Sequence, residues 1–157
     1  MQHDLHSLRV GVAPTRREVF SNPLAVRRKE TVLAKMAEFE GIMDFAGIYT
    51  EDLNPEGLMM RYAEAAAVQK KFSAAQADAL FVPHCNFGQE EAVAKLAKNM
   101  GVPVLIWGPR DPAPEGTAGR PTDSQCGLFA ATKVLQRYGV KFSYIENCHA
   151  DEKIFQE

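Results

Sequence analysis

Short apolar runs alternate along the chain with longer segments in which apolar residues recur every three or four positions. The apolar runs predict five strands, at 8–13, 44–49, 78–83, 103–107 and 141–145. The segments between them predict four helices, the first beginning at 22 and the others spanning 54–76, 88–100 and 122–138. This alternation is typical of a parallel sheet with helices on both faces. We therefore expect an α/β fold: a three-layer, doubly wound, flavodoxin-like or Rossmann-like sheet of five parallel strands in the order 2-1-3-4-5.

The expected helix boundaries depend on local capping signals. Asn22-Pro23 and Asn54-Pro55 each combine a capping residue with a first-turn proline. Thr122 and Gln125 have the spacing of a capping box at the start of the fourth helix, and Gly101 is expected to end the third helix in a left-handed conformation. The inward-facing residues expected on the second and fourth helices are Leu58, Tyr62, Ala65, Phe72, Leu128, Ala131, Val134, Leu135 and Tyr138.

Composition indicates one globular domain and argues against two classes of partner. Hydrophobic residues make up 46% of the 157 residues and charged residues 24%, and the net charge is -2. That charge provides no basic surface for nucleic acid. No apolar run approaches the roughly 20 residues that span a bilayer, and the first residues lack the pattern of a secretory leader. We expect a cytoplasmic protein that binds neither nucleic acid nor membrane.

The chain divides into a tail, a domain and the start of a further element. Residues 1–7 are expected to be a flexible tail, and residues 8–149 to form the α/β domain. Residues 150–157 begin a helix that the sequence does not complete, and Ile154-Phe155 has no obvious packing partner within the chain. This abrupt end favours a fragment of a longer protein over a natural short product.

Cysteine and histidine are too sparse and too scattered to indicate a disulfide framework or a metal site. Three cysteines lack Cys-x-x-Cys spacing and are expected to be free thiols. By residue type alone, metal ligands are available at His84, Asp111, Asp123 and His149, but they come from separate segments without a recognisable spacing. His3 and His6 fall in the expected tail. We therefore predict no complete metal site in this chain.

Polar side chains collect where the predicted strands end, which is where open parallel sheets bind ligands. Arg16 and Arg17 follow the first strand, and the segment His84-Cys85-Asn86-Phe87-Gly88 follows the third. Arginine suits carboxylates, phosphates and vicinal hydroxyls; a solvated arginine pair is the alternative. His84 and Cys85 are adjacent on an extended segment and point to opposite sides, which argues against a base and its nucleophile. The segment is better interpreted as a pocket wall.

A long segment after the fourth strand calls for a separate explanation. It spans 14 residues, 108–121, of which seven are Gly or Pro. Segments of this length in compact domains are commonly functional. Arg110 and Asp111 lie at its start, where a site is expected, although a local ion pair between them is the alternative. The segment is expected to hold a ligand, cover a neighbouring subunit or simply connect two elements.

Four stretches of sequence resemble the N-terminal domain of the L-fucose/L-arabinose isomerase family, and in particular its fucose-isomerase-like members. They are EAAAVQKKFSAAQADALFVPHCNFGQ, VPVLIWGPRD, GRPTDSQCGLFAATKVLQRYGVKFSYIEN and the early TRR. The likeness extends from about Leu8 to Glu157. It implies aldose–ketose isomerisation through an enediol, helped by a divalent metal, usually Mn²⁺, in a cytoplasmic homo-oligomer. In that family the metal ligands lie in later domains, so the resemblance implies that this chain binds no cofactor and is inactive alone.

The resemblance also implies which residues face the sugar. The substrate-binding residues expected from it and from their positions at the strand ends are Arg16, Arg17, Cys85, Asn86, Phe87, Trp107, Arg110 and Asp111. Cys85 stands where the family places an aromatic residue, which points to a different or larger sugar. The implied partners are the sugar, the chain's own C-terminal domains and neighbouring subunits, and the long segment is expected to complete a neighbour's site.

Two functions remain open from the sequence. The first is the substrate-facing and oligomerisation domain of a metal-dependent L-fucose/L-arabinose-type isomerase in carbohydrate metabolism. The second is a stand-alone flavodoxin-like or sugar-binding module that binds a small ligand without chemistry. The length of the chain and its five strands suit the second; the resemblance and the unfinished last helix favour the first.

Overall fold

The fold is a five-stranded sheet with helices on both faces. The computed structural model describes residues 7–113 and 119–157. The strand order is β2-β1-β3-β4-β5, and every neighbouring pair is parallel. The fold class and strand order expected from the sequence are therefore confirmed. All but residue 7 of the expected tail, with His3 and His6, and residues 114–118 of the long segment lie outside the described residues.

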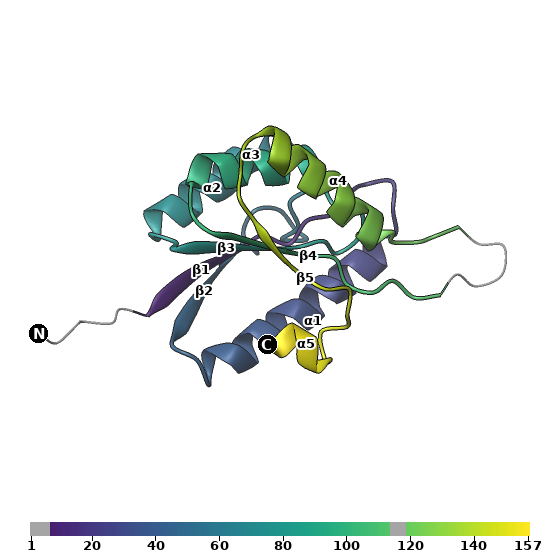
Figure 1. The fold of residues 1–157 in the computed structure, drawn as a ribbon, viewed down its shortest axis with the longest axis horizontal. Coiled ribbons are helices and arrows are strands. Elements are labelled where there is room, and N and C mark those ends of the chain that lie inside the picture. Colours follow the sequence, from purple (N-terminus) through teal and green to yellow (C-terminus); the bar gives the residue numbers. More distant parts are fainter. Residues whose placement is uncertain (1–6, 114–118) are drawn as a thin grey trace, which may run out of the picture.

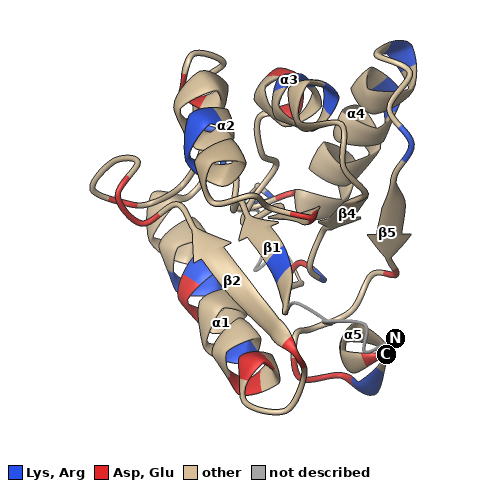
Figure 2. Cartoon of the chain, turned by 90° about the vertical axis from the view of Figure 1, so that its left-hand side faces the viewer, with Lys and Arg blue, Asp and Glu red and all other residues tan. Residues whose placement is uncertain are grey.

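Strands and helices alternate along the whole described chain. The elements are β1 (Leu8–Val12), α1 (Asn22–Glu40), β2 (Phe45–Tyr49), α2 (Glu64–Ala74), β3 (Ala79–Pro83), α3 (Glu90–Met100), β4 (Val104–Trp107), α4 (Ser124–Arg137), β5 (Ser143–Ile145) and α5 (Lys153–Gln156). Each strand lies within its predicted range. Helices α2, α3 and α4 cover one face of the sheet, and α1 and α5 lie on the other (Figure 1). Figure 2, turned by 90°, shows the same division into three layers.

The main core lies between the sheet and helices α2, α3 and α4. Phe72, Leu80, Leu96, Ile106 and Leu135 are almost completely buried there. These residues come from the apolar faces that the helical and strand periods predict. Gly101 ends α3 at φ 64°, as its position predicted. The central strands β3 and β4 are thus fixed from this side, which holds their carboxyl ends in place.

The second face of the sheet has a smaller core, and α5 is part of it. Phe155 is only 7% exposed, and its ring centroid lies 4.6 Å from that of Trp107. Phe39 and Phe81 also contact it, with ring centroids 6.2 Å away. The expectation that Ile154-Phe155 lacks a packing partner is therefore wrong for Phe155. The short α5 folds back beneath β4, a return that no local pattern indicated.

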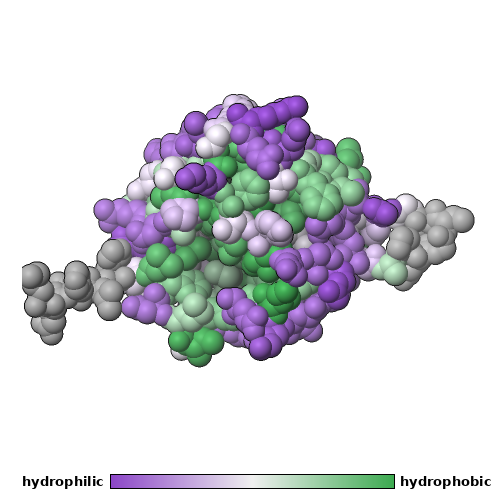
Figure 3. Space-filling model, in the orientation of Figure 1, coloured by the Kyte–Doolittle hydropathy of each residue, from purple (hydrophilic) through white to green (hydrophobic). Residues whose placement is uncertain are grey.

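Part of this second face stays open. A groove of about 570 Å³ runs along it, and its lining includes Leu8, Met43, Phe45, Tyr144 and Ile154. Leu8, Met43, Tyr144 and Ile154 are at least one-third exposed. Figure 3, which views the sheet edge-on with β5 in front, shows apolar side chains between polar ones across the middle of this side of the molecule. Exposed apolar surface of this extent is typical of a contact face.

Two helix starts differ from the prediction. The cap position of α1 is Ser21, whereas Asn22 lies inside the helix and its Nδ2 donates to Glu56 Oε1 at 2.7 Å. Asn54 starts a turn: its side-chain oxygen accepts the N–H of Glu56 at 3.0 Å. The chain then forms a single parallel bridge at Met59 and a further turn, and α2 begins only at Glu64. An asparagine side chain can accept a backbone N–H in a turn as well as at the start of a helix, and the side chain of Asn54 does so in a turn.

Two of the expected inward aromatic residues are at the surface. Tyr62 is 47% exposed because it precedes the shortened α2, and Tyr138 is 39% exposed at the end of α4. Both expectations were wrong. Leu58 is fully buried, but in a small cluster with Ala25 and Cys85 rather than on a helix.

Candidate functional site

The carboxyl ends of β1 and β3 are joined through Thr15. This residue is fully buried, and its backbone N–H donates to Pro83 O at 2.9 Å. The N–H of Cys85 donates back to Thr15 O at 2.9 Å. The hydroxyl donates to Met59 O at 2.8 Å and accepts the N–H of Gln89 at 3.0 Å. Three of these bonds join the loop after β1 to the end of β3 and the loop after it, and the bond to Met59 ties in the segment before α2, so that all three segments are fixed relative to one another.

Asn86 makes a second link between the same loops. Its side chain is fully buried, and Oδ1 accepts the N–H of Arg17 at 2.7 Å and that of Gly88 at 3.1 Å. Its Nδ2 donates to Arg17 O at 3.2 Å. All three bonds go to backbone groups of the two loops. The arrangement fixes the backbone of Arg17 beside the segment that carries Phe87.

Arg17 and Phe87 form the arrangement at this edge that is best suited to bind a ligand. The guanidinium carbon lies 4.4 Å from the centroid of the Phe87 ring, within the range of a cation–π contact. Arg17 also forms an ion pair with Glu90 in the first turn of α3. Phe20 stacks on Phe87 with ring centroids 5.5 Å apart. Arg17 keeps 28% of its side chain exposed, so part of this donor group faces the outside.

Arg16, its neighbour, is placed differently. Its residue exposure is 7%, and its Nε donates to Glu56 Oε2 at 2.7 Å. Glu56 also accepts Nδ2 of Asn22. Arg16 therefore ties the β1 loop to the turn before α2 and to the start of α1. The solvated pair left open by the sequence applies to neither arginine, because each has a carboxylate partner.

His84 and Cys85 are both enclosed in the protein. Burial lowers the pKa of His84 to about 4, and its Nδ1 lies 3.0 Å from Phe87 O. Burial raises the pKa of Cys85 to about 12, and the residue packs with Ala25 and Leu58. A neutral thiol of this kind is a poor nucleophile. The pair supports the wall of the site without offering a base and a nucleophile.

The loop that carries Phe87 is packed directly against α4. A Cβ built on Gly127 would lie 1.7 Å from Phe87 O, so any larger residue forces the two backbones apart. Gly88 has φ 78°, and a Cβ there would lie 2.4 Å from His84 Nδ1. Glycine is required at both positions, by close approach at one and by backbone conformation at the other.

Asp111 lies at the carboxyl end of β4 and caps α4. Its Oδ2 accepts the N–H of Ser124 at 2.7 Å, and its Oδ1 accepts the Thr122 hydroxyl at 2.6 Å. The expected Thr122–Gln125 capping box is therefore wrong. The cap position is Asp123, at φ 48° and without a side-chain cap bond. The carboxylate of Asp111, 13 residues before Ser124, accepts the otherwise unpaired backbone N–H at the start of the helix. A local sequence motif cannot indicate a cap that lies so far along the chain.

Arg28, from the middle of α1, joins this network. It donates to Asp111 Oδ1 at 3.0 Å and also contacts the Ser124 hydroxyl. Burial would raise the pKa of Asp111, but the bonds from Thr122, Arg28 and Ser124 outweigh it and hold the pKa below its usual value. Arg110 pairs with Glu152 at 2.9 Å. The alternative of a local Arg110–Asp111 ion pair is therefore wrong.

The eight expected substrate residues thus fall into two groups. Arg17, Asn86 and Phe87 meet at the ends of β1 and β3, with Arg16 and Cys85 behind them. Trp107, Arg110 and Asp111 lie at the end of β4. Two shallow hollows adjoin them: one of about 410 Å³ is lined in part by Arg17, and one of about 530 Å³ in part by Trp107 and Arg110. No lining residue belongs to both.

Several contributors escaped the sequence analysis. Thr15 was visible only as the residue before two arginines, and Phe20 and Arg28 had no distinguishing pattern. Glu90 left a signal, because an acidic residue in the first turn of α3, three positions after Phe87, is well placed to meet an arginine. The other contributors are held by contacts between residues that lie 40 to 96 positions apart in the sequence.

The four candidate metal ligands do not come together. His84 is fully buried, Asp111 is engaged by Arg28 and α4, Asp123 pairs with Arg120, and His149 is exposed. Among residues 7–113 and 119–157, no group of three or more His, Cys, Asp or Glu side chains is arranged to hold a metal ion. The residues present therefore do not fit the divalent metal of the isomerase resemblance.

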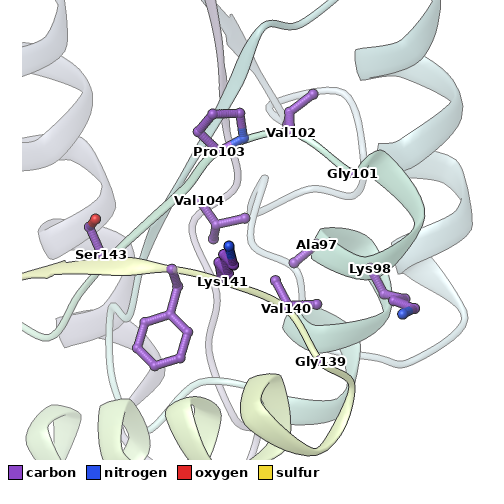
Figure 4. Close-up of a pocket in the computed structure, with 11 residues that line it drawn as sticks. Ala97, Lys98, Gly101, Val102, Pro103, Val104, Gly139, Val140, Lys141 and Ser143 are labelled. Atoms are coloured by element: carbon purple, nitrogen blue, oxygen red, sulfur yellow. The ribbon is translucent and has the colours of Figure 1, made fainter.

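A further cavity, of about 540 Å³, lies at the opposite edge of the sheet, between the ends of α3 and α4 and the starts of β4 and β5 (Figure 4). Its only charged lining residues are Lys98 and Lys141, and it is remote from the strand ends that carry the polar groups. Within the described ranges, no helix has both the length and the apolar character to cross a bilayer.

One family model matches this sequence over nearly its whole length. A family model described as "Fucose/sulfoquinovose isomerase, N-terminal domain" matches residues 11–157. No curated protein matches the sequence. Among solved structures, an ABC transporter solute-binding protein from Bacillus halodurans C-125 with bound myo-inositol is similar, with 10% identity and a TM-score of 0.43. The match covers 95% of this chain and 59% of that one. Because the family model spans nearly the whole sequence, this chain belongs to the fucose/sulfoquinovose isomerase N-terminal domain family.

Proposed function

We propose that this chain is the substrate-facing and oligomerisation domain of a metal-dependent aldose–ketose isomerase in cytoplasmic carbohydrate metabolism. The observation that carries the proposal is the family match over residues 11–157. The arrangement of Arg17, Asn86 and Phe87 at the carboxyl edge of the sheet supports it. The reaction class is an intramolecular oxidoreduction, in which a proton moves between C1 and C2 of an open-chain sugar.

Within this domain, we assign sugar binding to the ends of β1 and β3. Arg17 offers its exposed N–H groups to sugar hydroxyls or to the carbonyl oxygen. The stacked rings of Phe20 and Phe87 add an apolar surface beside the same guanidinium for the C–H groups of a sugar. Asn86 holds the two loops in register without facing the substrate, since its side chain is fully buried. Arg16 and Cys85 support the wall from behind.

The metal belongs to other parts of the proposed enzyme. A divalent cation such as Mn²⁺ would polarise the sugar oxygens. No described residues of this chain form a site for it, so its ligands are assigned to later domains or to a neighbouring subunit. The contribution of this domain is to bind and orient the sugar and to exclude water around C1 and C2. The domain alone is therefore proposed to be inactive.

The open groove on the α1 and α5 side is assigned to contacts with the remaining domains or with other subunits. Leu8, Met43, Tyr144 and Ile154 expose apolar surface along it. Burying such surface provides roughly 25 cal/mol per Å². The segment 108–121, which follows the carboxyl end of β4 in the sequence, is assigned to covering a neighbouring subunit's site.

The decisive experiment is an isomerase assay on the longest natural chain that contains this domain. The panel includes L-fucose, L-arabinose, related aldoses and sulfoquinovose, each tested with Mn²⁺ and after chelation. We expect Mn²⁺-dependent conversion of at least one aldose to its ketose. Absence of turnover across the panel with metal bound would reject the proposal. Sugar binding without turnover would instead support the alternative, a binding module without catalysis.

A further inference from the structure

A second pocket, with charged groups around an apolar floor, lies apart from the proposed sugar site. Its volume is about 530 Å³, and it lies between α1, the start of the segment after β4, and the turn at 149–151. Its lining includes Arg28, Val32, Lys35, Trp107, Arg110 and His149. It adjoins the carboxyl end of β4, where parallel sheets offer ligand sites. None of its lining residues borders the hollow beside Arg17.

The charged groups of this pocket are mainly cationic. Arg28, Lys35 and Arg110 line it together with His149, and Asp151 is the only carboxylate among the lining residues. Three carboxylates approach from outside: Asp111 on Arg28, Glu38 on Lys35 and Glu152 on Arg110. With these partners and Asp151 counted, four carboxylates stand against the three cations, so an anion can bind only by replacing a carboxylate partner of Lys35 or Arg110.

Two of the three cations are available to a ligand. The Lys35 side chain is 20% exposed and pairs with Glu38, which is 62% exposed, whereas Arg110 is 48% exposed in its pair with Glu152. Ion pairs with at least one partner open to solvent in this way are weak and exchange readily. Arg28 is held more firmly, by Asp111, Ser124 and backbone carbonyls. It provides a fixed positive charge, and the other two provide donors that can turn towards a ligand.

The rest of the pocket is apolar and suits a molecule larger than a simple ion. Val32 and Trp107 are buried beneath it, and Pro109, Pro112 and Ala150 border it. A volume of about 530 Å³ is within the range of small-molecule sites. An oxyanion held by Arg110 and Lys35 would place its attached ring or chain over the apolar part.

We infer that this pocket binds a sugar-sized molecule that carries one oxyanion, either a phosphoryl group or a carboxylate. The anion is recognised by Lys35 and Arg110, with Arg28 as the fixed charge behind them. The carbon skeleton lies against Val32 and Trp107. The inference does not depend on the proposed isomerase function, because the pocket shares no residue with the Arg17 site.

Trp107 makes the test direct, because it is the only tryptophan in the chain. Its indole fluorescence and its single indole N–H resonance both report on the pocket. We would titrate the 157-residue chain at low salt with a hexose 6-phosphate, gluconate, an unphosphorylated hexose and inorganic phosphate. We expect a saturable change in both signals below about 10 mM for the first two, and weaker binding when salt is added.

Paired variants separate recognition from overall charge. Lys35→Gln/Arg110→Gln is expected to weaken binding at least about tenfold. Lys133→Gln/Arg137→Gln removes the same charge from exposed positions on α4 and is expected to leave binding unchanged. Lys35 forms an ion pair with Glu38 of its own helix, so Lys35→Gln alone should weaken binding while the unliganded spectrum of Trp107 stays that of the parent.

Three results would overturn the inference. They are an absence of any saturable Trp107 signal, equal binding of the neutral hexose or of inorganic phosphate, and equal weakening by the two double variants. Tighter binding of gluconate than of the hexose phosphate would support it and identify the anion as a carboxylate. A failed isomerase assay has no bearing on this result, so the two proposals fail separately.

Discussion

The carboxylate of Asp111 caps helix α4 from 13 residues away, with Oδ2 accepting the backbone N–H of Ser124 at 2.7 Å. The same side chain accepts a hydrogen bond from Arg28, so it connects α1, the end of β4 and the start of α4. Both partners of the ion pair are at least three-quarters buried. A single side chain thus fixes the elements around the second pocket.

Replacement of Asp111 is expected to destabilise the domain more than its position in a loop suggests. Asp111→Ala removes the cap of α4 and leaves Arg28 without its carboxylate, and we expect a loss of about 2–3 kcal/mol in the free energy of unfolding. Urea denaturation followed by circular dichroism measures it. Asp151→Ala, at an exposed position nearby, is the matched control and should change stability by less than about 0.5 kcal/mol. Equal effects of the two variants would contradict the capping role.

The buried His84 predicts a pH dependence of stability. Burial lowers the pKa of His84 in the folded state to about 4, against an ordinary value of 6.5. Between those values the unfolded chain binds a proton that the folded chain does not, so stability falls as the pH decreases from 6.5 to 4. The full difference corresponds to about 3 kcal/mol. Below that window the lowered pKa of Asp111 adds a further loss, since its contribution is present only while the carboxylate is ionised.

Urea midpoints measured from pH 4.5 to 7.5 test the role of His84. His84→Gln is expected to flatten the dependence between pH 4.5 and 6.5, whereas His149→Gln, at an exposed histidine, should leave it intact. A slope that survives in His84→Gln at its original size would show that another group is responsible.

The packing of Gly127 against Phe87 predicts a severe effect of one methyl group. In Gly127→Ala the new Cβ would lie 1.7 Å from Phe87 O, and both atoms are held by backbone. We expect a loss of about 1–3 kcal/mol from overpacking, together with displacement of the Phe87 loop. Gly119→Ala is the control, since no described atom lies within 4 Å of a Cβ placed there. Thermal unfolding of both variants measures the difference, and a neutral Gly127→Ala would contradict the close approach.

The periodic pattern of the sequence predicted the fold because the central strands β3 and β4 are apolar runs that lie buried between the two helix layers. The pattern failed to predict helix starts and side-chain contacts where the hydrogen-bond partner of a residue is not the one that the local motif suggests. Thr122 and Gln125 have the spacing of a capping box, yet Asp111 supplies the cap. Asn54 has the form of a helix start, yet it closes a turn on Glu56. Arg17 and Phe87 were both expected at the strand ends, but their contact depends on the buried clamp of Asn86, which no spacing shows.

The adjacent residues Ile154 and Phe155 offer a test of the return of α5 onto the sheet. Phe155 is 7% exposed against Trp107, whereas Ile154 is 37% exposed. Phe155→Ala is expected to cost about 2–4 kcal/mol and to shift Trp107 emission to longer wavelength as water reaches the indole. Ile154→Ala, the control, should leave the emission unchanged. Unchanged emission in Phe155→Ala as well would show that α5 does not pack on the sheet in solution.

Arg17 is the residue on which the proposed sugar site depends most. Its guanidinium is held over Phe87 and beside Glu90 but remains partly exposed, so it can donate to a ligand. In the full-length enzyme, Arg17→Ala is expected to raise KM for the aldose by roughly tenfold, the loss of one or two hydrogen bonds from a charged donor. Arg27→Ala removes the same charge from an exposed position on α1 and should leave KM unchanged. Asn86→Ala should also raise KM and lower stability, because Asn86 acts through the position of Arg17. If Arg17→Ala leaves KM unchanged while Asn86→Ala raises it, the clamp positions another substrate contact, and the assignment of Arg17 is wrong.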